Sequence, residues 1–169
     1  MQARELLTDL YGHMEWADAA VWSAVLASAA AGADETTRGR LHHIHLVQRA
    51  FLSLWREEPV DRNAGEGLAP RELAEWARGY YALARRHLVE APPEAFDRPV
   101  NVPWTRQAGE RLGFEPAPTS LIETAVQVYA HTGHHRGQVI GRLRELGATP
   151  PLVDYIAWLW QRRPPAAWP

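Results

Sequence analysis

Cysteine is absent from the 169 residues of this chain. Its absence excludes disulfides, thiolate metal ligands and a cysteine nucleophile, so a metal site here would have to use nitrogen and oxygen ligands. The chain also lacks an apolar run near the roughly 20 residues of a membrane span. Its first residues enter an amphipathic pattern without a secretion signal. We therefore expect a soluble, cytoplasmic protein that does not bind membranes.

Concentrated basic charge is also scarce. The formal net charge is −2, and no basic run is longer than the pairs Arg85-Arg86 and Arg162-Arg163. Nucleic-acid binding normally needs a concentrated basic face, so this class of partner is disfavoured. Hydrophobic residues make up 46% of the chain, which argues against disorder. The length predicts one domain over residues 1–169.

Apolar residues recur every three or four positions in four long segments, which predicts four amphipathic helices. Ser120-Leu-Ile-Glu123 is a capping box that opens the last of them. With a shorter helix near the C-terminus, the pattern predicts an all-α four-helix bundle with one long crossover loop. The expected helices run over Ala3–Ser28, Glu35–Glu57, Pro70 to Pro92, Leu121–Leu146 and Leu152–Trp160.

The crossover loop runs from Glu94 to Pro118 and is rich in proline and glycine. Two apolar stretches within it, Val100–Trp104 and Leu112–Phe114, are compatible with a short hairpin or with an ordered loop, and the sequence leaves both open. A loop this long in a compact domain is often functional.

Two histidines in the last long segment indicate chemistry. His131 and His135 are four residues apart, a spacing that stacks side chains on one helical face. A helical wheel places both on the predicted core-facing stripe, and places His43 on or beside the inward stripe of the second helix. Buried imidazoles without partners would cost about 1–3 kcal/mol per unsatisfied group, a cost that a shared cation removes. We therefore predict a divalent-metal site at His43, His131 and His135.

Three nitrogen ligands leave at least one coordination position for water or substrate, the arrangement of catalytic metal sites. Zinc and nickel both suit imidazole, and iron or manganese is compatible with the same ligands. The sequence does not identify a separate catalytic residue. The simpler alternative is that a histidine in a helix serves as a surface residue or a hydrogen-bonded core residue, which would leave a helical interaction module with an empty site.

Neighbouring residues have two interpretations each. Gln138 could bond a ring nitrogen of the site or make a helix–helix hydrogen bond. Gly137 and Gly141 would let another helix approach closely, which suggests packing at a dimer seam. His13 and His87 could approach the site from other helices, although packing is the commoner role of such residues.

Four segments resemble the DinB/YfiT-like family of helical bundles. Trp16-Ala17-Asp18 is similar to the first-helix motif of this family, and His43-Ile44 with Phe51-Leu52 is similar to its second-helix pattern. His131-Thr-Gly-His134-His135-Arg136-Gly137-Gln138 is similar to its His-x-x-x-His-Arg-Gly-Gln motif, and the tail Leu146–Tyr155 resembles the ending of the family. The chain departs from the pattern at Gln48, where many members carry glutamate.

The resemblance implies metal ligands at His43, His131 and His135, with His42, His45 and His134 as neighbours, and it implies a homodimer. Characterised members include transferases and isomerases that use low-molecular-weight thiols, and others are described as metal-dependent hydrolases. We therefore expect a metal-dependent enzyme that activates a thiol or water for attack on a small electrophile, with thiol transfer ranked ahead of hydrolysis. The alternative class is a non-catalytic, stress-related metal-binding bundle.

Overall fold

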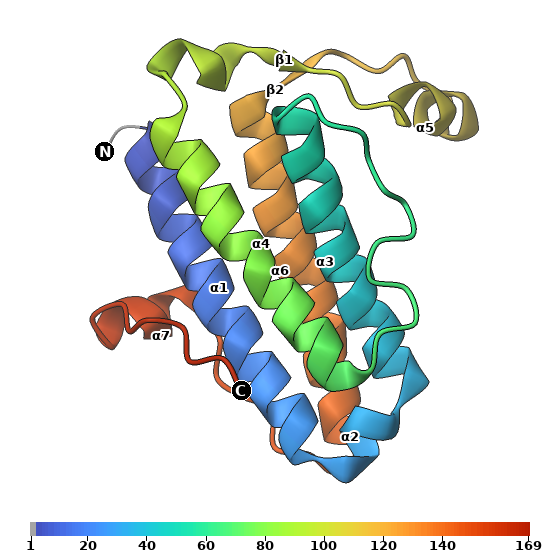
Figure 1. Ribbon diagram of the computed structural model, residues 1–169, viewed down its shortest axis with the longest axis vertical. Helices are drawn as coiled ribbons and strands as arrows, with labels where there is room; N and C mark the ends of the chain where they lie inside the picture. The colour runs from blue at the N-terminus through green and yellow to red at the C-terminus, as the bar shows by residue number, and fades with distance from the viewer. Residues whose placement is uncertain (1–2) are drawn as a thin grey trace.

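The computed structural model describes residues 3–169, and within this range four long helices form a bundle (Figure 1). This arrangement confirms the predicted all-α fold. The long helices are α1 (Ala3–Ala27), α3 (Glu35–Trp55), α4 (Pro70–Glu90) and α6 (Leu121–Glu145). The short helical elements are α2 (Ala29–Ala33), the 3₁₀ helix η1 (Pro93–Asp97), α5 (Thr105–Leu112) and α7 (Tyr155–Trp160), and the strands are β1 (Pro99–Val100) and β2 (Thr119–Ser120).

The four long helices pack in a closed ring, because α1 contacts α4 and α6 while α3 contacts the same two helices. Figure 1 shows that α1 and α6 run in one direction and that α3 and α4 run in the other. Since α3 and α4 are parallel, residues 56–69 must return along the length of the bundle to join them. The connection from α4 to α6 crosses one end of the bundle instead.

Local capping explains where the helices begin and end. Ser28 ends α1 and its Oγ accepts a hydrogen bond from the Ala31 amide, so the predicted break restarts as the short helix α2. Asp34 caps α3 through the Thr37 amide at 2.8 Å. The predicted capping box of Ser120 and Glu123 is present at the start of α6. Gly147 follows α6 with φ +72°, a left-handed conformation that favours glycine.

Val100–Trp104 and Leu112–Phe114 do not form the hairpin that the sequence left open as one of two alternatives. β1 pairs antiparallel with β2, with Val100 opposite Thr119. Residues 105–112, which include the start of the second proposed strand, form helix α5. The two strands are separated by enough residues of the connection for an eight-residue helix to form between them. Gly113 ends that helix with φ +78°.

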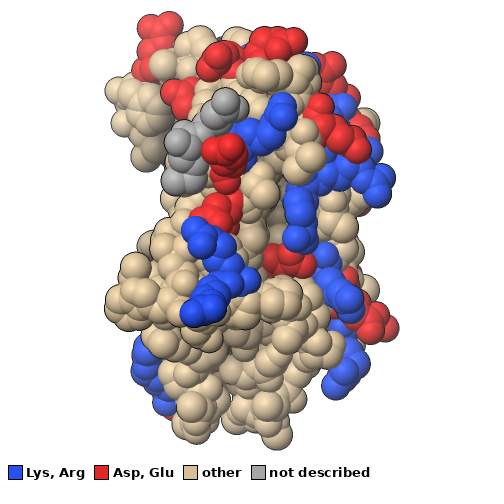
Figure 2. Space-filling model, turned by 90° about the vertical axis from the view of Figure 1, so that its left-hand side faces the viewer, with Lys and Arg blue, Asp and Glu red and all other residues tan. Residues whose placement is uncertain are grey.

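Two clusters of buried apolar side chains fill the bundle. Tyr11, Trp55 and Tyr80 belong to the cluster at the end nearer the α4–α6 connection, and Trp22, Ile44 and Leu143 belong to the other. In the described part of the chain, no helix combines the length and the apolar character that a membrane span needs. Figure 2 shows arginine side chains intermingled with acidic ones on the face that it presents.

Candidate metal centre

Helices α3 and α6 lie side by side and bring the three predicted histidines together. His43 comes from α3, and His131 and His135 come from successive turns of α6. One ring nitrogen from each side chain lies within 4.8 Å of the other two. The centroids of the His131 and His135 rings are 4.4 Å apart, and the His43 ring is 4.7 Å from His135 and 5.0 Å from His131. We call these three residues the histidine cluster.

The cluster lies at the edge of the core, which corrects the prediction that His131 and His135 face it. Both rings are half-buried. His43, which the helical wheel placed on or beside the inward stripe of α3, is exposed, and His45 is the histidine of α3 that is buried. The positions of α6 that do face the core between Val128 and Val139 are Thr132 and Arg136. The spacing allowed either set, because both sets repeat at four residues. Thr132 and Arg136 are the buried set because Asp18 on α1 pairs with Arg136 inside the bundle.

Burial and repulsion from neighbouring rings keep His131 and His43 neutral. Partial burial and the neighbouring His135 and His43 rings lower the pKa of His131 to about 4, and burial with the nearby His135 lowers the pKa of His43. A neutral imidazole keeps a lone pair on one ring nitrogen, which is the form that binds a metal. His131 and His43 therefore offer metal-binding lone pairs at neutral pH.

Gln138 orients one of the rings. His135 Nδ1 donates to Gln138 Oε1 over 2.9 Å, because an amide oxygen can only accept. The proton is thereby placed on Nδ1 and the lone pair on Nε2, as in metal sites whose histidines are held through their second nitrogen. This contact confirms the ring-nitrogen interpretation of Gln138. The amide nitrogen of Gln138 lies 3.1 Å from Nε2 of the exposed His134.

The donor set fits a divalent ion. His43 Nε2 and His131 Nε2 are 3.2 Å apart, close to the separation of about 3.3 Å for two nitrogens bound tetrahedrally at 2.0–2.1 Å from zinc. Without an ion, two neutral rings at this distance can share only one proton. In addition, His131 Nδ1 is buried and has no hydrogen-bond partner among residues 3–169. Protein groups alone therefore leave the hydrogen bonding of these rings incomplete.

The other histidines lie outside the cluster, as expected. His42 Nε2 donates to the Ala64 carbonyl over 2.9 Å, and its ring stacks near Trp76. His13 is buried between Val153 and Tyr129, with Nε2 2.9 Å from the Val153 carbonyl. His87 stacks on Trp55 at the far end of α4. None of these three belongs to the metal-binding group found in the described residues.

A buried polar network next to the cluster was missed from the sequence. Gln48 Nε2 lies 3.1 Å from Asp18 Oδ2, 3.1 Å from the Tyr81 hydroxyl and 3.2 Å from Thr132 Oγ1. Arg136 donates to the other oxygen of Asp18 over 2.9 Å. The network thus joins α1, α3, α4 and α6 beneath the histidines. The available signal was the position of Gln48 and Arg136 at core spacing, since polar residues there need partners.

The same network continues to His45, which is fully buried. His45 Nδ1 donates to Gln48 Oε1 over 2.9 Å, and its Nε2 accepts from the Trp22 indole, also over 2.9 Å. Both nitrogens of His45 are therefore satisfied by protein groups, and this residue is a core histidine. The contact between Gln48 and Asp18 explains why glutamine stands at position 48 in place of glutamate. The amide nitrogen of Gln48 donates to Asp18, whereas a glutamate carboxylate there would repel the Asp18 carboxylate.

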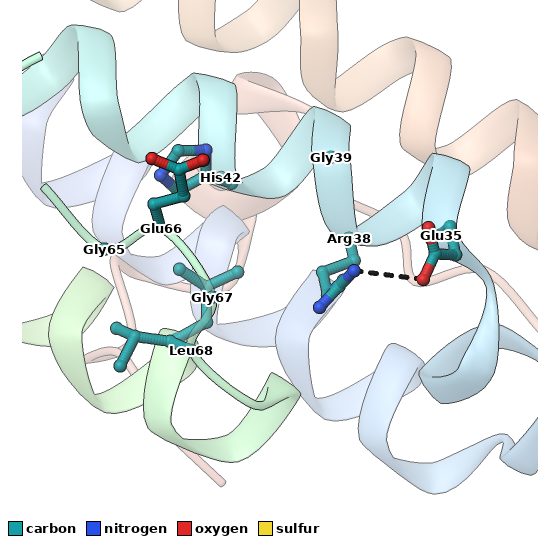
Figure 3. Close-up of a pocket in the computed structure, with 9 residues that line it drawn as sticks. Glu35, Arg38, Gly39, His42, Gly65, Glu66, Gly67 and Leu68 are labelled. Atoms are coloured by element: carbon teal, nitrogen blue, oxygen red, sulfur yellow. Dashed lines mark hydrogen bonds and ion pairs between the residues drawn. The ribbon is translucent and has the colours of Figure 1, made fainter. Parts of the chain in front are cut away.

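A separate cavity of about 410 Å³ lies between the start of α3 and the 56–69 connection (Figure 3). Glu35 and Arg38 form an ion pair of 3.1 Å at one side of it, and His42 and Glu66 lie at the other. None of the three cluster histidines lines this cavity. Its charged groups are already paired or exposed, so we assign the chemistry to the histidine cluster.

Fold and site together define a four-helix bundle with three histidines that converge from two helices. The sequence model of the DinB family matches residues 10–166, and the chain belongs to that family. The match covers all three cluster histidines and nearly all of the four long helices. Searches of curated proteins and of solved structures returned no match.

Proposed function

We propose that the chain binds one divalent metal ion through His43, His131 and His135 and uses it to activate a small nucleophile. The observation that carries this proposal is the convergence of three imidazole nitrogens within 4.8 Å of one another at a partly open surface. Three ligands leave a coordination position free. The bound ion would lower the pKa of a thiol or a water placed in that position.

Transfer of a low-molecular-weight thiol to a small electrophile is the reaction that we rank first. The thiol proton leaves to solvent, the sulfur bonds to the electrophilic carbon, and the leaving group departs with its bonding electrons. Membership of the DinB family supports this ranking. The metal-binding group contains three histidines and no carboxylate among the described residues, so the group itself includes no carboxylate that could act as a general base for hydrolysis. Hydrolysis is the second candidate.

Each side chain has a separate role. His43 fixes the cluster to α3, and His131 and His135 fix it to α6, so the rigid pairing of these helices sets the spacing of the nitrogens. Gln138 holds the His135 ring with its Nε2 lone pair free. Zinc and nickel match three imidazoles best, while iron and manganese are compatible.

A thiol panel with a chromogenic electrophile tests the proposal. Metal-loaded wild-type protein should consume the electrophile in a thiol-dependent manner, and His135→Ala should lose both metal and turnover. His134→Ala is the matched control, because this exposed neighbour is outside the cluster and should leave both unchanged. Equal rates for wild type and His135→Ala would overturn the proposed reaction. Loss of metal uptake in His134→Ala would overturn the ligand assignment.

A further inference from the structure

A second cavity, of about 320 Å³, opens beside the histidine cluster. On α3 it is lined by Leu46, Val47 and Ala50, and His43 lies at its edge. Because His43 belongs both to this cavity and to the cluster, a molecule held in the cavity has one end next to the proposed metal. The volume is at the lower end of the range of about 300–1,000 Å³ found for ligand pockets, so it suits a small molecule.

Two connections supply the opposite walls. Val60 and Arg62 come from the 56–69 segment that runs along α3, and Trp104 immediately precedes α5. The Trp104 ring packs edge-on against Phe51 of α3, with centroids 5.6 Å apart and an interplanar angle of 89°. Loop side chains over a rigid helix form a common arrangement for determining which ligand binds.

The apolar lining is incompletely covered in the protein alone. The side chains of Leu46, Val47, Ala50, Val60 and Trp104 are all half-buried. A ligand with an apolar body would remove this surface from water, and each buried Å² of apolar surface contributes about 25 cal/mol. The cavity therefore favours a hydrocarbon or aromatic body over a sugar or a polar chain.

Among residues 3–169, Arg62 is the one charged side chain in the lining apart from the titratable His43. It is exposed, and within residues 3–169 it has no hydrogen bond or ion pair. Other arginines near this end of the bundle are paired, such as Arg98 with Glu57 and Arg106 with Glu110. A guanidinium that is free at the rim of an apolar cavity matches a carboxylate, which it can bind through two parallel hydrogen bonds.

We propose that this cavity is the substrate pocket of the histidine cluster and that it takes a small carboxylate with an apolar body. The body lies between α3 and Trp104, the carboxylate pairs with Arg62, and the reacting end lies at His43. The catalytic meaning of the pocket rests on the proposed function, whereas the binding chemistry does not depend on the metal.

The test uses 4-phenylbutyrate as the probe and 4-phenylbutan-1-ol as its uncharged counterpart. Each is titrated into the full-length protein, once loaded with zinc and once treated with chelator, and the indole N–H signals are followed by ¹⁵N–¹H NMR. Trp104→Phe identifies the signal of Trp104. The carboxylate should shift this signal more than the other indole signals and bind about fivefold more tightly than the alcohol, the ratio for an exposed ion pair near 1 kcal/mol.

Three variants locate the binding. Arg62→Gln should abolish the preference for the carboxylate, while Arg71→Gln, which removes an exposed charge on α4 outside the cavity, should preserve it. Ala50→Leu should fill the cavity and weaken both probes. Circular dichroism checks that Ala50→Leu is folded. If Ala50→Leu does not fold, Arg62→Gln, a change at the exposed rim, tests the pocket by itself.

Several results would overturn the pocket. These are absence of probe binding in both forms of the protein, a carboxylate preference that survives Arg62→Gln, and binding that folded Ala50→Leu leaves unchanged. Binding only to the zinc form with no effect of Arg62→Gln would show that the probe ligates the ion and would also overturn it. Zinc uptake is measured separately by equilibrium dialysis. Uptake without probe binding refutes the pocket alone, and probe binding without uptake refutes the proposed function alone.

Discussion

Arg136 on α6 and Asp18 on α1 form an ion pair of 2.9 Å inside the bundle, where the exposed fractions of their side chains are 7% and 4%. The second oxygen of Asp18 accepts hydrogen bonds from the Tyr81 hydroxyl and from Gln48. Removing one partner of a buried pair leaves an uncompensated charge. The pair therefore joins the first and last long helices next to the histidine cluster.

We expect Asp18→Asn to lower the free energy of unfolding by about 3–5 kcal/mol, because Arg136 would stay buried without its counter-charge. Denaturant titration followed by circular dichroism measures the change. The control is Arg106→Gln, which breaks an exposed pair with Glu110 and should cost no more than about 0.5 kcal/mol. A cost for Asp18→Asn as small as that of the control would contradict this role of the pair.

Gln48→Glu replaces the amide by glutamate, which many DinB-like sequences carry at this position. It would place a carboxylate close to Asp18, because Gln48 Nε2 now lies 3.1 Å from Asp18 Oδ2, and repulsion between the two would raise the pKa of one of them. We expect the variant to be less stable than wild type at pH 8 and to recover as the pH falls, since the introduced carboxyl group, once protonated, can donate to Asp18 as the amide does.

Unfolding titrations at pH 8 and pH 5 measure this recovery. Gln127→Glu, an exposed change of the same chemistry on α6, is the control and should show little difference between the two pH values. If Gln48→Glu were as stable as wild type at pH 8, the hydrogen-bonding argument for the amide would be wrong.

Gln138→Leu removes the acceptor that holds the His135 ring. Loss of such a partner of a metal-bound histidine typically lowers metal affinity about 10–100-fold. Competition with a chromophoric chelator measures the zinc affinity, and Gln127→Leu on the same helix is the matched control. Unchanged affinity in Gln138→Leu would show that packing alone orients His135.

Chelation should leave the fold intact, because the rings of the metal centre are half-buried or exposed at the edge of the core, while the two buried apolar clusters fill the interior of the bundle. We expect an unchanged far-ultraviolet circular dichroism spectrum after chelation. Free zinc at about 100 times its Kd should add about 2.7 kcal/mol to the free energy of unfolding, and His135→Ala should abolish this gain. Collapse of the helical signal on chelation would instead favour the non-catalytic, structural alternative.

The burial of His13 leads us to expect that part of the free energy of unfolding depends on pH. Burial lowers its pKa from 6.5, with a smaller opposing effect of the Val153 carbonyl. Since the unfolded state then binds more protons around and below pH 6.5, the stabilisation from His13 is complete above that pH and is lost on acidification. His13→Asn should therefore differ most from wild type at pH 8 and less at pH 5, as measured by unfolding in the presence of chelator. An equal difference at both pH values would contradict this explanation.

Periodicity in the sequence predicted the four long helices and their approximate ends, because each helix needs only one apolar stripe and a local capping group. The capping box at Ser120 and Glu123 and the stop at Gly147 are of this local kind. The strands were not predictable in the same way. Two residues such as Pro99–Val100 carry no periodicity, and their pairing with Thr119–Ser120 depends on how the whole connection folds.

For the candidate site, the spacing on α6 and the second-helix pattern of the family selected His43, His131 and His135, whose rings lie together in the structure. Spacing could not decide how deeply they lie. Their placement at the core edge follows from Arg136, whose charge could enter the core only because Asp18, from a helix distant in sequence, meets it there. A single helical wheel contains no information about that partner.

What the sequence determined by itself is therefore the set of helices and the residue types able to bind a metal, since both depend on contacts within a few positions of the chain. The tertiary structure decided which polar residues are buried, how the short strands pair and where an apolar cavity with an exposed arginine adjoins the cluster. Each of these depends on contacts between side chains from separate helices and connections. Such contacts form, and contribute to stability, only when those segments pack together.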